Sequence, residues 1–577
     1  MPKKPLQTTS QHPRVEGRKR MARPAREPRS GFSSRSGSSS RSGSSSRSGC
    51  CSHLGFGSRS GLSSAWVWVF VGFFSLNVGL MGGCGDDDSG HENNNHNDNV
   101  NTNVDPLDSG CPGRLDPVEL TGETVVVGDG SGESCTSAAL HEAVETVNTA
   151  GGGSITFDCG ADHTLTLDES LSVTAPLIVD GEHEVTLSGG DAVRLFDLDH
   201  HTEFTIQRIT LTQGRTQESG AAIHHPWYGT LTVIDATFID NHCTSEAGEI
   251  GGGAIFAGGL EEAIISGSMF VSNSASNGGA ILNRGSTLTV VDTYFLNNWT
   301  TSSNDSGQFG NGGALYIDGM NYDVDGDFHL CGSVFQGNHA NQHGSALFGY
   351  FYTGSHAYID RCLFTENEFD GSPTGGAGGL YHQGDDVALT LTNSTLSFNR
   401  SDNHAAGLFV GSGSAPSQVV NCTFAGNVVP EVGAAVFNGA SRIEFSHCTF
   451  WGNEGDYGPA IFKGESATMR LTSCVFADNY SPNQYSAYAC HATLEDGGGN
   501  LQWPQTKDSG NDDNPCAEGV TFADPLLAPL GENGGPVPTM ALPEESPAVD
   551  AATGCPESDA RGEPRGDPCD SGAFELQ

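Results

Sequence analysis

The sequence is organised by a short motif, Phe-x-x-Asn, with nine copies between residues 238 and 479, eight exact and one with leucine in the first position. Successive asparagines are 32, 25, 40, 29, 32, 28, 26 and 26 residues apart. A unit that repeats at this length is one supersecondary turn stacked on the next, so a long solenoid is expected. The copies, one with leucine in place of phenylalanine, are Phe238/Asn241, Phe270/Asn273, Phe295/Asn298, Phe335/Asn338, Phe364/Asn367, Leu396/Asn399, Phe424/Asn427, Phe450/Asn453 and Phe476/Asn479.

A second element lies between these copies and is rich in small residues followed by an aliphatic one. It reads GAAI at 220–223, GGAIF at 252–256 and GGALY at 312–316. Around it apolar and polar residues alternate, which is the period of a β-strand. Glycine is abundant (79 residues) and charged residues make up only 17%, a composition that favours short strands and tight turns over helices.

In a parallel coil, equivalent residues of consecutive repeats stack about 4.8 Å apart. Phenylalanine then stacks on phenylalanine inside, and asparagine, which tolerates the left-handed backbone conformation, hydrogen-bonds the asparagine of the next repeat. A small residue stands two positions before each phenylalanine, on the same inward face. Four of these are cysteines, which we interpret as buried spacers and not as a metal or redox centre. The column is Ala236, Ser268, Thr293, Ser333, Cys362, Ser394, Cys422, Cys448 and Cys474.

Charge divides the chain into two parts. Residues 1–64 hold 13 of the 26 Lys and Arg residues and two acidic residues, in a Ser/Arg/Gly-rich segment that is expected to be disordered or to lie upstream of the true start. The other residues hold 13 basic and 68 acidic side chains, a net charge of −55 with histidine neutral. This charge repels phosphates, so nucleic acid is not an expected partner. Calcium is a candidate ligand of so acidic a surface.

A secretory segment comes after the basic region. Residues 65–83 are apolar and end in Leu80-Met81-Gly82-Gly83 before Cys84, which resembles a bacterial lipobox and implies a lipid on Cys84. The alternative is an uncleaved membrane anchor. Either interpretation exports the acidic part to the cell envelope, with the outer membrane or cell surface as the expected location. The polar residues 85–115 are expected to be a flexible tether.

The segment after the tether is expected to close the exposed end of the coil. Residues 136–148 read as a short amphipathic helix opened by Thr136 or Ser137. A helix at this place protects the backbone of the first strands. Cys135 and Cys159 flank the helix and form a candidate disulfide in an exported chain.

The combination of GGA[ILV] and FxxN, over about 220–480, resembles the repeat of chlamydial polymorphic outer-membrane proteins. That resemblance implies a right-handed parallel β-helix of the pectin-lyase-like class, exposed at the surface and adhesive. No outer-membrane barrel sequence follows the repeats, so an autotransporter route is not expected.

The tail carries a second resemblance. Its Asp524, Asn533-Gly534-Gly535-Pro536, Ser546-Pro547-Ala548-Val549-Asp550, Arg561-Gly562 and Cys569-Asp570-Ser571-Gly572-Ala573-Phe574-Glu575 are similar to the end of choice-of-anchor Q domain proteins. In that family the attachment device varies, and here the N-terminal lipid is the expected anchor. The tail is irregular and needs covalent staples, for which the candidate pairs are Cys490 with Cys516 and Cys555 with Cys569. Cys111, Cys243 and Cys331 stay unassigned, and the 13 cysteines after Cys84 leave at least one thiol unpaired.

The charged residues help to distinguish a catalytic function from a binding function. The exported part has two lysines and eleven arginines, and Arg284, Arg361, Arg400, Arg442 and Arg470 lie on different repeats with no acidic cluster beside them. Asp235 and Asp292 share a repeat position, but the repeat between them has Gly267, so both are interpreted as solvated strand residues. No catalytic residue, metal ligand or cofactor-binding residue is therefore assigned.

The expected protein is an all-β, single-stranded, right-handed parallel β-helix with a capping helix and an irregular C-terminal domain. Its expected function is an envelope-anchored, adhesin-type scaffold that binds a polysaccharide or surface protein; the alternative is a calcium-dependent polysaccharide lyase or glycoside hydrolase. The expected segments are 1–64 (disordered), 65–84 (signal and lipobox), 85–115 (tether), 116–195 (cap and first coils), 196–480 (repeats) and 481–577 (choice-of-anchor Q-like region).

Overall fold

The computed structural model describes residues 109–248, 250–302, 309–319, 327–371, 375–384, 386–411 and 415–577. The chain divides into two units, Met1–Phe70 and Val71–Gln577, and every described residue belongs to the second. The predictions for 1–64, for the signal segment 65–84 and for lipidation at Cys84 therefore lie outside the described residues.

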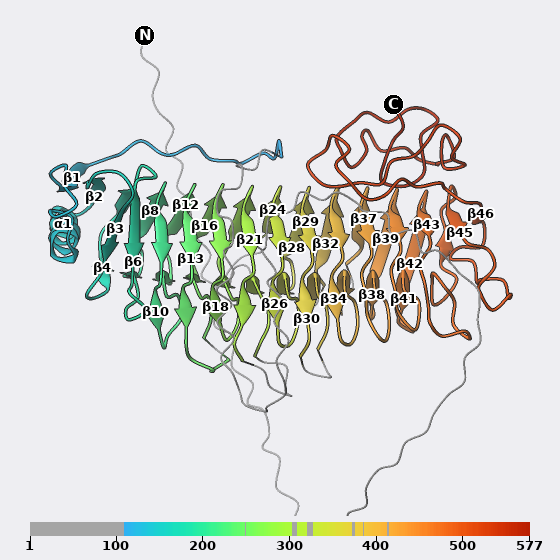
Figure 1. Ribbon diagram of the computed structural model, residues 1–577, viewed down its shortest axis with the longest axis horizontal. Coiled ribbons are helices and arrows are strands. Elements are labelled where there is room, and N and C mark those ends of the chain that lie inside the picture. The colour runs from blue at the N-terminus through green and yellow to red at the C-terminus, as the bar shows by residue number, and fades with distance from the viewer. Residues whose placement is uncertain are drawn as a thin grey trace, which may run out of the picture. The chain divides into compact units, whose positions relative to one another are not determined.

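The described chain winds into a parallel β-helix with four sheets, here called A to D (Figure 1). In the middle of the coil each turn contributes one strand to sheet A, then to B, D and C, before the chain returns to A one step further along. All pairings between these strands are parallel. One such turn runs through β12, β13, β14 and β15 before it reaches β16.

Sheet A consists of β1 (Glu123–Gly128), β2 (Gly153–Asp158), β5 (Leu177–Asp180), β8 (Glu203–Gln207), β12 (Thr230–Ile234), β16 (Glu262–Ser266), β20 (Leu288–Val291), β24 (Asp327–Cys331), β28 (His356–Asp360), β32 (Ala388–Thr392), β36 (Ser417–Val420), β39 (Arg442–Ser446), β42 (Thr468–Thr472) and β44 (Glu495–Asp496). Sheet B consists of β3 (His163–Thr166), β6 (Val185–Ser188), β9 (Thr210–Thr212), β13 (Thr237–Ile239), β17 (Met269–Val271), β21 (Tyr294–Leu296), β25 (Val334–Gln336), β29 (Leu363–Thr365), β33 (Thr395–Ser397), β37 (Thr423–Ala425), β40 (Thr449–Trp451), β43 (Val475–Ala477), β45 (Leu501–Trp503) and β46 (Thr521–Phe522).

Sheet C consists of β4 (Leu171–Val173), β7 (Phe196–Leu198), β11 (Ile223–Pro226), β15 (Ile255–Gly258), β19 (Ile281–Arg284), β23 (Leu315–Asp318), β27 (Leu347–Phe351), β31 (Leu380–Gly384), β35 (Leu408–Val410), β38 (Val436–Asn438) and β41 (Ile461–Lys463). Sheet D consists of the two-residue strands β10 (Arg215–Thr216), β14 (His242–Cys243), β18 (Ser274–Ala275), β22 (Trp299–Thr300), β26 (His339–Ala340), β30 (Glu368–Phe369) and β34 (Arg400–Ser401).

The Phe-x-x-Asn motif forms each rung in the way its residue types predict. Its phenylalanines are fully buried in the centre of sheet B strands, and neighbouring rings stack with centroids 4.5–5.0 Å apart, except where Leu396 interrupts the stack. Each asparagine amide donates to the side-chain oxygen of the next asparagine at 2.8–3.0 Å, from Asn241 to Asn479 without a break. Aromatic burial and an unbroken amide ladder thus join the rungs that carry the motif.

The left-handed turns do not fall on the asparagines of the motif, so the role predicted for their backbone is wrong. Positive φ angles occur instead at the residue before each asparagine, as at Asp240 (52°) and Asp478 (52°), and again three residues before each phenylalanine, as at Asp235 (50°) and His447 (52°). These two turns bound each strand of sheet B that carries the motif. The motif asparagines keep ordinary φ values, and their contribution is the buried side-chain ladder. This correction applies to Asn241, Asn273, Asn298, Asn338, Asn367, Asn399, Asn427, Asn453 and Asn479.

The four cysteines in the small-residue column are buried free thiols. Cys448 Sγ lies 3.3 Å from Val419 O and 3.4 Å from Ser446 O, and Ser394 Oγ at the same position donates to Thr392 O. Burial raises the pKa of the Cys448 and Cys474 thiols well above the ordinary value. Protonated, enclosed thiols have no nucleophilic role, so they serve as packing residues.

Both ends of the coil differ from the regular rungs. Helix α1 (Ser137–Ala150) begins after Thr136, whose side chain accepts from Ala139 N (3.2 Å), and its Leu140, Val144 and Val147 join the core cluster. At the other end the coil continues past 480 through β44, β45 and β46, so the predicted boundary is too early. Those rungs lack Phe-x-x-Asn, and the motif could not reveal them.

Three disulfides match the candidate pairs: Cys135–Cys159, Cys490–Cys516 and Cys555–Cys569. A fourth, Cys111–Cys331, joins two of the cysteines left unassigned. Cys243 is the remaining one; it is buried, and burial raises its pKa to about 11.

Candidate functional site

The first rungs of the corner between sheets A and B are covered by an extended segment, residues 109–121, which we call the strap (Figure 1). It runs back along the coil against the order of the rungs and bonds the ends of sheet A strands. Three of its backbone N–H groups donate to side chains: Leu115 to Ser266 Oγ (2.9 Å), Val118 to Gln207 Oε1 (2.8 Å) and Thr121 to Ser154 Oγ (3.1 Å). This corner is therefore not available to a ligand.

The strap begins against the middle of the coil. The Cys111–Cys331 disulfide fixes it there, and Arg361 Nη1 donates to Gly110 O at 2.8 Å. The prediction of a flexible tether over 85–115 is therefore wrong for residues 109–115. The remaining part of that range lies outside the described residues.

Asp235 and Asp292 hold the strap, so their interpretation as solvated strand residues is wrong. Arg114 Nη2 pairs with Asp235 Oδ1 at 2.7 Å, and Ser109 Oγ donates to Asp292 Oδ1 at 2.5 Å. Gly267 lies between the two aspartates because a Cβ there would stand 1.9 Å from the Arg114 guanidinium. The glycine at this repeat position, between two rungs that have aspartate there, thus leaves room for the Arg114 side chain of the strap.

Further along, the C-terminal domain, residues 523–577, covers the same corner and the outer face of sheet B. Phe574, Leu542 and Ala548 form an apolar cluster with Val475 and Leu501 of the coil. Polar contacts join the same surfaces: Thr553 N donates to Ser473 Oγ (2.8 Å), Ala573 N to Thr449 Oγ1 (3.0 Å) and Thr395 Oγ1 to Pro538 O (2.7 Å).

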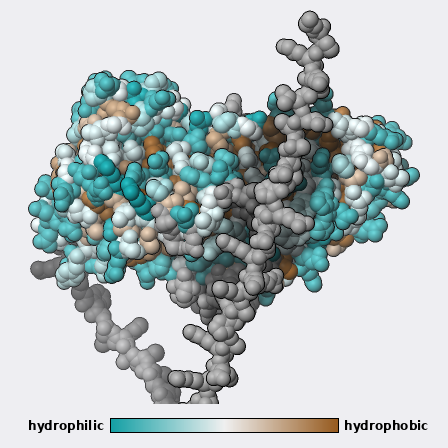
Figure 2. All heavy atoms as spheres, turned by 180° about the vertical axis from the view of Figure 1, so that it is seen from behind, coloured by the Kyte–Doolittle hydropathy of each residue, from teal (hydrophilic) through white to brown (hydrophobic). Residues whose placement is uncertain are grey.

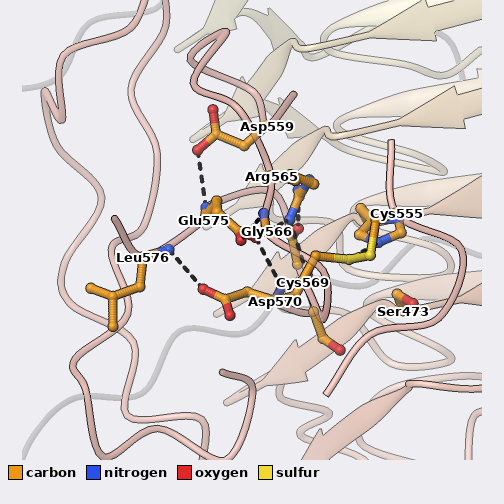
Figure 3. A network of polar contacts seen from close by, with 12 residues as sticks. Ser473, Cys555, Asp559, Arg565, Gly566, Cys569, Asp570, Glu575 and Leu576 are labelled. Atoms are coloured by element: carbon orange, nitrogen blue, oxygen red, sulfur yellow. Dashed lines mark hydrogen bonds and ion pairs between the residues drawn. A yellow bond between two sulfur atoms is a disulfide. The ribbon is translucent and has the colours of Figure 1, made fainter. Parts of the chain in front are cut away.

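A buried charge network holds this domain in shape (Figure 3). The Arg565 side chain is fully buried and donates to Glu575 Oε2 (3.1 Å), to two backbone carbonyls, of Asp570 (3.0 Å) and Gly572 (2.7 Å), and to Asn421 Oδ1 (3.0 Å) of the coil. Asp570 accepts from the backbone N–H of Leu576 at 2.7 Å. These charged residues of the tail therefore act as a structural clamp and are not open to a substrate.

An aromatic ladder lies on the outer face of sheet C, and sequence reasoning did not predict it. Its members from Tyr381 to Phe462 stack with centroids 4.3–5.1 Å apart and ring planes within 8° of parallel. The ring faces are consequently covered by one another, and only edges point outward. Sugar rings stack on open aromatic faces, so the ladder stabilises the rungs and offers no such platform. Its members in register are His224, Phe256, Leu282, Tyr316, Phe348, Tyr381, Phe409, Phe437 and Phe462.

The outer face of sheet A carries a different column, which we call the polar column. Tyr358 in it is 37% exposed, and its ring stacks with the rings of His329 (centroids 5.0 Å apart) and His356 (4.0 Å). The column spans about 29 Å, since seven rungs succeed one another at about 4.8 Å. Its members in register are His329, Tyr358, Thr390, Gln418, Glu444, Arg470 and Glu495.

Near its C-terminal end the polar column borders a small hollow. The hollow has a volume of about 180 Å³ and is lined by Arg442, Ile443, Glu444, Thr468, Met469, Arg470 and Glu495. The sequence indicates no acidic cluster beside the arginines, whereas parallel pairing places Glu444 beside Arg470 and Arg470 beside Glu495. A sequence signal existed: every member of the column except Glu495 stands six residues before the phenylalanine or leucine of its motif.

The hollow holds two ion pairs with exposed side chains. Arg442 Nη2 lies 2.8 Å from Glu444 Oε1, with the two side chains 60% and 40% exposed. Arg470 Nη1 lies 3.6 Å from Glu495 Oε1, with side chains 46% and 68% exposed. Exposed pairs of this kind contribute little to stability, so a ligand can replace water at both of them.

Other titratable groups are placed where they cannot act on a ligand. Burial lowers the pKa of His225 to about 4 and of His382 to about 3, so these inward side chains are neutral at pH 7. Within the described ranges no group of three or more His, Cys, Asp or Glu side chains is arranged to hold a metal ion. Of the helices that can be described, none is long and apolar enough to cross a membrane.

The comparisons with known proteins agree with the geometry. Residues 348–502 match the family model described as "Right handed beta helix region". A search of curated proteins found no match. The coil is thus a right-handed parallel β-helix, a fold that by itself decides neither binding nor catalysis.

Proposed function

We propose that this protein is an exported, envelope-anchored scaffold that binds an extended glycan or surface protein along the polar column of sheet A. The observation that supports the proposal is the distribution of covered surfaces. The strap and the C-terminal domain cover the corner next to sheet B, and the ladder of sheet C is stacked on itself. The polar column keeps exposed or half-buried hydrogen-bonding side chains in register over seven rungs.

The surface chemistry fits a protein exposed to water and to a ligand. Figure 2 shows one face on which hydrophilic residues predominate and hydrophobic ones occupy separate small areas. Four disulfides support export to an oxidising compartment. The lipid at Cys84 would supply the anchor, and Cys84→Ala should then release the protein from membranes; continued membrane association would contradict it.

The experiment that tests binding uses the purified exported portion on arrayed glycans and on cell-envelope fractions, with and without calcium. Retention without new reducing ends or unsaturated products is expected. The same assay tests the alternative, a polysaccharide lyase or glycosidase, which the Glu444, Arg470 and Glu495 side chains around one hollow favour. If the protein cleaves a polysaccharide and Glu444→Gln abolishes that cleavage, the enzymatic function replaces the binding function.

A further inference from the structure

We infer that the hollow beside Arg442 and Arg470 binds an uncharged, hydroxyl-rich glycan and not an acidic one. This inference rests on the proposed function and narrows it to one ligand chemistry. Three independent properties of the site carry it: the alternation of donors and acceptors, the balance of charge and the size of the hollow.

Donors and acceptors alternate along the last three rungs of the polar column. Glu444, Arg470 and Glu495 occupy paired positions on β39, β42 and β44, and Arg442 stands two residues from Glu444 on β39. Guanidinium groups only donate hydrogen bonds, and ionised carboxylates only accept them. A sugar with neighbouring hydroxyl groups both donates and accepts at each oxygen. Such a ligand can satisfy a carboxylate and a guanidinium at the same time, whereas an anionic group can use only the guanidinium.

The charge of the site also disfavours an anion. Two arginines and two glutamates give the hollow no net charge, and each arginine is already paired with a glutamate. The surrounding chain after residue 64 carries a net charge of −55. A uronate or sulfate approaching the hollow would therefore meet long-range repulsion and two carboxylates at its destination.

The dimensions fit one sugar unit with the chain continuing along the column. A volume of about 180 Å³ is below the usual range of sites that enclose a drug-sized ligand. Gln418 and Thr390 continue the column beyond the hollow and supply an amide and a hydroxyl for the next units. The Tyr358 ring already stacks with two histidine rings, and no aromatic residue lines the hollow, so hydrogen bonding and not stacking recognises the chain.

The test compares neutral polymers (a β-glucan, a xylan and a mannan) with polygalacturonate, alginate and chondroitin sulfate. Binding of the full exported portion is measured by affinity electrophoresis and calorimetry at 50 and 500 mM salt. We expect at least one neutral polymer to bind, with a Kd that changes less than twofold between the two salt concentrations. Arg470→Ala should weaken that binding at least tenfold. Arg400→Ala is the matched control, because Arg400 is also exposed and pairs with a glutamate, Glu368, at 3.5 Å, but lies on sheet D.

The outcomes separate this inference from the proposed function. Binding to anionic polymers alone, lost at 500 mM salt, would overturn the neutral ligand while leaving a glycan-binding scaffold. Neutral binding that survives Arg470→Ala, in a variant with unchanged thermal unfolding, would overturn the site. Retention by a protein component alone would overturn the glycan class. No retention on any glycan or envelope fraction would contradict the proposed function itself.

Discussion

At the scale of single residues, each rung depends on one asparagine that serves three neighbours. Asn427 Nδ2 donates to Leu396 O and to Asn453 Oδ1, both at 2.9 Å, while its own Oδ1 accepts two N–H groups of Asn399. All of these atoms are buried. Removal of one motif asparagine therefore leaves N–H donors of the asparagine in the preceding rung without an acceptor.

Asn427→Ala should lower the free energy of unfolding by about 3 kcal/mol, because two buried N–H groups of Asn399 lose their acceptor. Chemical denaturation of both proteins measures the difference. Asn511→Ala, at an exposed asparagine, is the control and should change stability by less than about 0.5 kcal/mol. Equal effects of the two substitutions would contradict the ladder's role.

Buried histidines make the fold sensitive to acid. Burial lowers the pKa of His382 and of His447 to about 3 in the folded state, against an ordinary value of 6.5. The unfolded state binds these protons first, so the stability is present above pH 6.5 and is lost as the pH falls from about 6.5 toward 3. Each histidine contributes a slope of about 1.4 kcal/mol per pH unit in that window.

His382→Asn should reduce the dependence of the unfolding free energy on pH by that amount. Asparagine fits there because Asn283 of β19 and Asn438 of β38 occupy the same inward position. Denaturation at pH 7, 6, 5 and 4 provides the measurement. The exposed His200→Asn variant should keep the slope of the unaltered protein. An unchanged slope in His382→Asn would show that this group is not the one that titrates.

At the scale of elements, the strap is held by contacts that are distant in sequence. Its hydrogen bonds join residues 33 to 252 positions apart, and its disulfide joins residues 220 apart. Within a chain-entropy account, closing a loop of that length stabilises the fold by about 5 kcal/mol, against about 3 kcal/mol for a loop of the size closed by Cys555–Cys569. The strap is thus the element most dependent on one covalent bond.

Paired Cys111→Ser and Cys331→Ser substitutions should lower stability by up to about 5 kcal/mol, more than Cys555→Ser with Cys569→Ser. They should also speed amide exchange at Leu115, Val118 and Thr121, whose N–H groups bond the coil. Chemical denaturation measures the first effect and hydrogen–deuterium exchange the second. Protection that persists without the disulfide would show that the hydrogen bonds alone hold the strap.

The sequence predicted rungs well and the strap poorly for one physical reason. In each rung the phenylalanine, the small residue and the asparagine contact the same residue types of the next rung. Their spacing in the sequence therefore indicates the coil without further information. Residues 109–115 have no periodicity, and their partners are specified only when the coil has formed. The charged hollow could be predicted in part. Glu444 and Arg470 each stand six residues before a motif phenylalanine, so the sequence places them in one column. Glu495 pairs with Arg470 only because its rung has one additional residue, within a stretch containing Gly497, Gly498 and Gly499.

At the scale of the whole described molecule, Arg565 is a buried charged residue that links the C-terminal domain to the coil. The guanidinium satisfies Glu575 within the domain and Asn421 on the coil, and both carboxylate and guanidinium are almost completely buried. Removal of one partner from such a pair strands the other charge.

Arg565→Ala should therefore lower stability by about 3–5 kcal/mol and expose the tail to protease. Arg565→Lys should restore little, because one ammonium group cannot make the four contacts of the planar guanidinium. Limited proteolysis with mass analysis locates the cleavage, and Arg215→Ala, at an exposed arginine of β10, serves as the control. A tail that resists protease in Arg565→Ala would show that its apolar contacts suffice.

The Cys111–Cys331 bond also decides how a mechanical load passes through the protein. When the chain ahead of Cys111 is pulled against the C-terminus, tension enters the rung of β24 directly through the disulfide. Residues 112–330, which include α1 and all the rungs before β24, then lie off the load path and stay wound. Under that load the coil would extend only through the residues after Cys331, and reduction of that one bond would place the whole coil in series with the force.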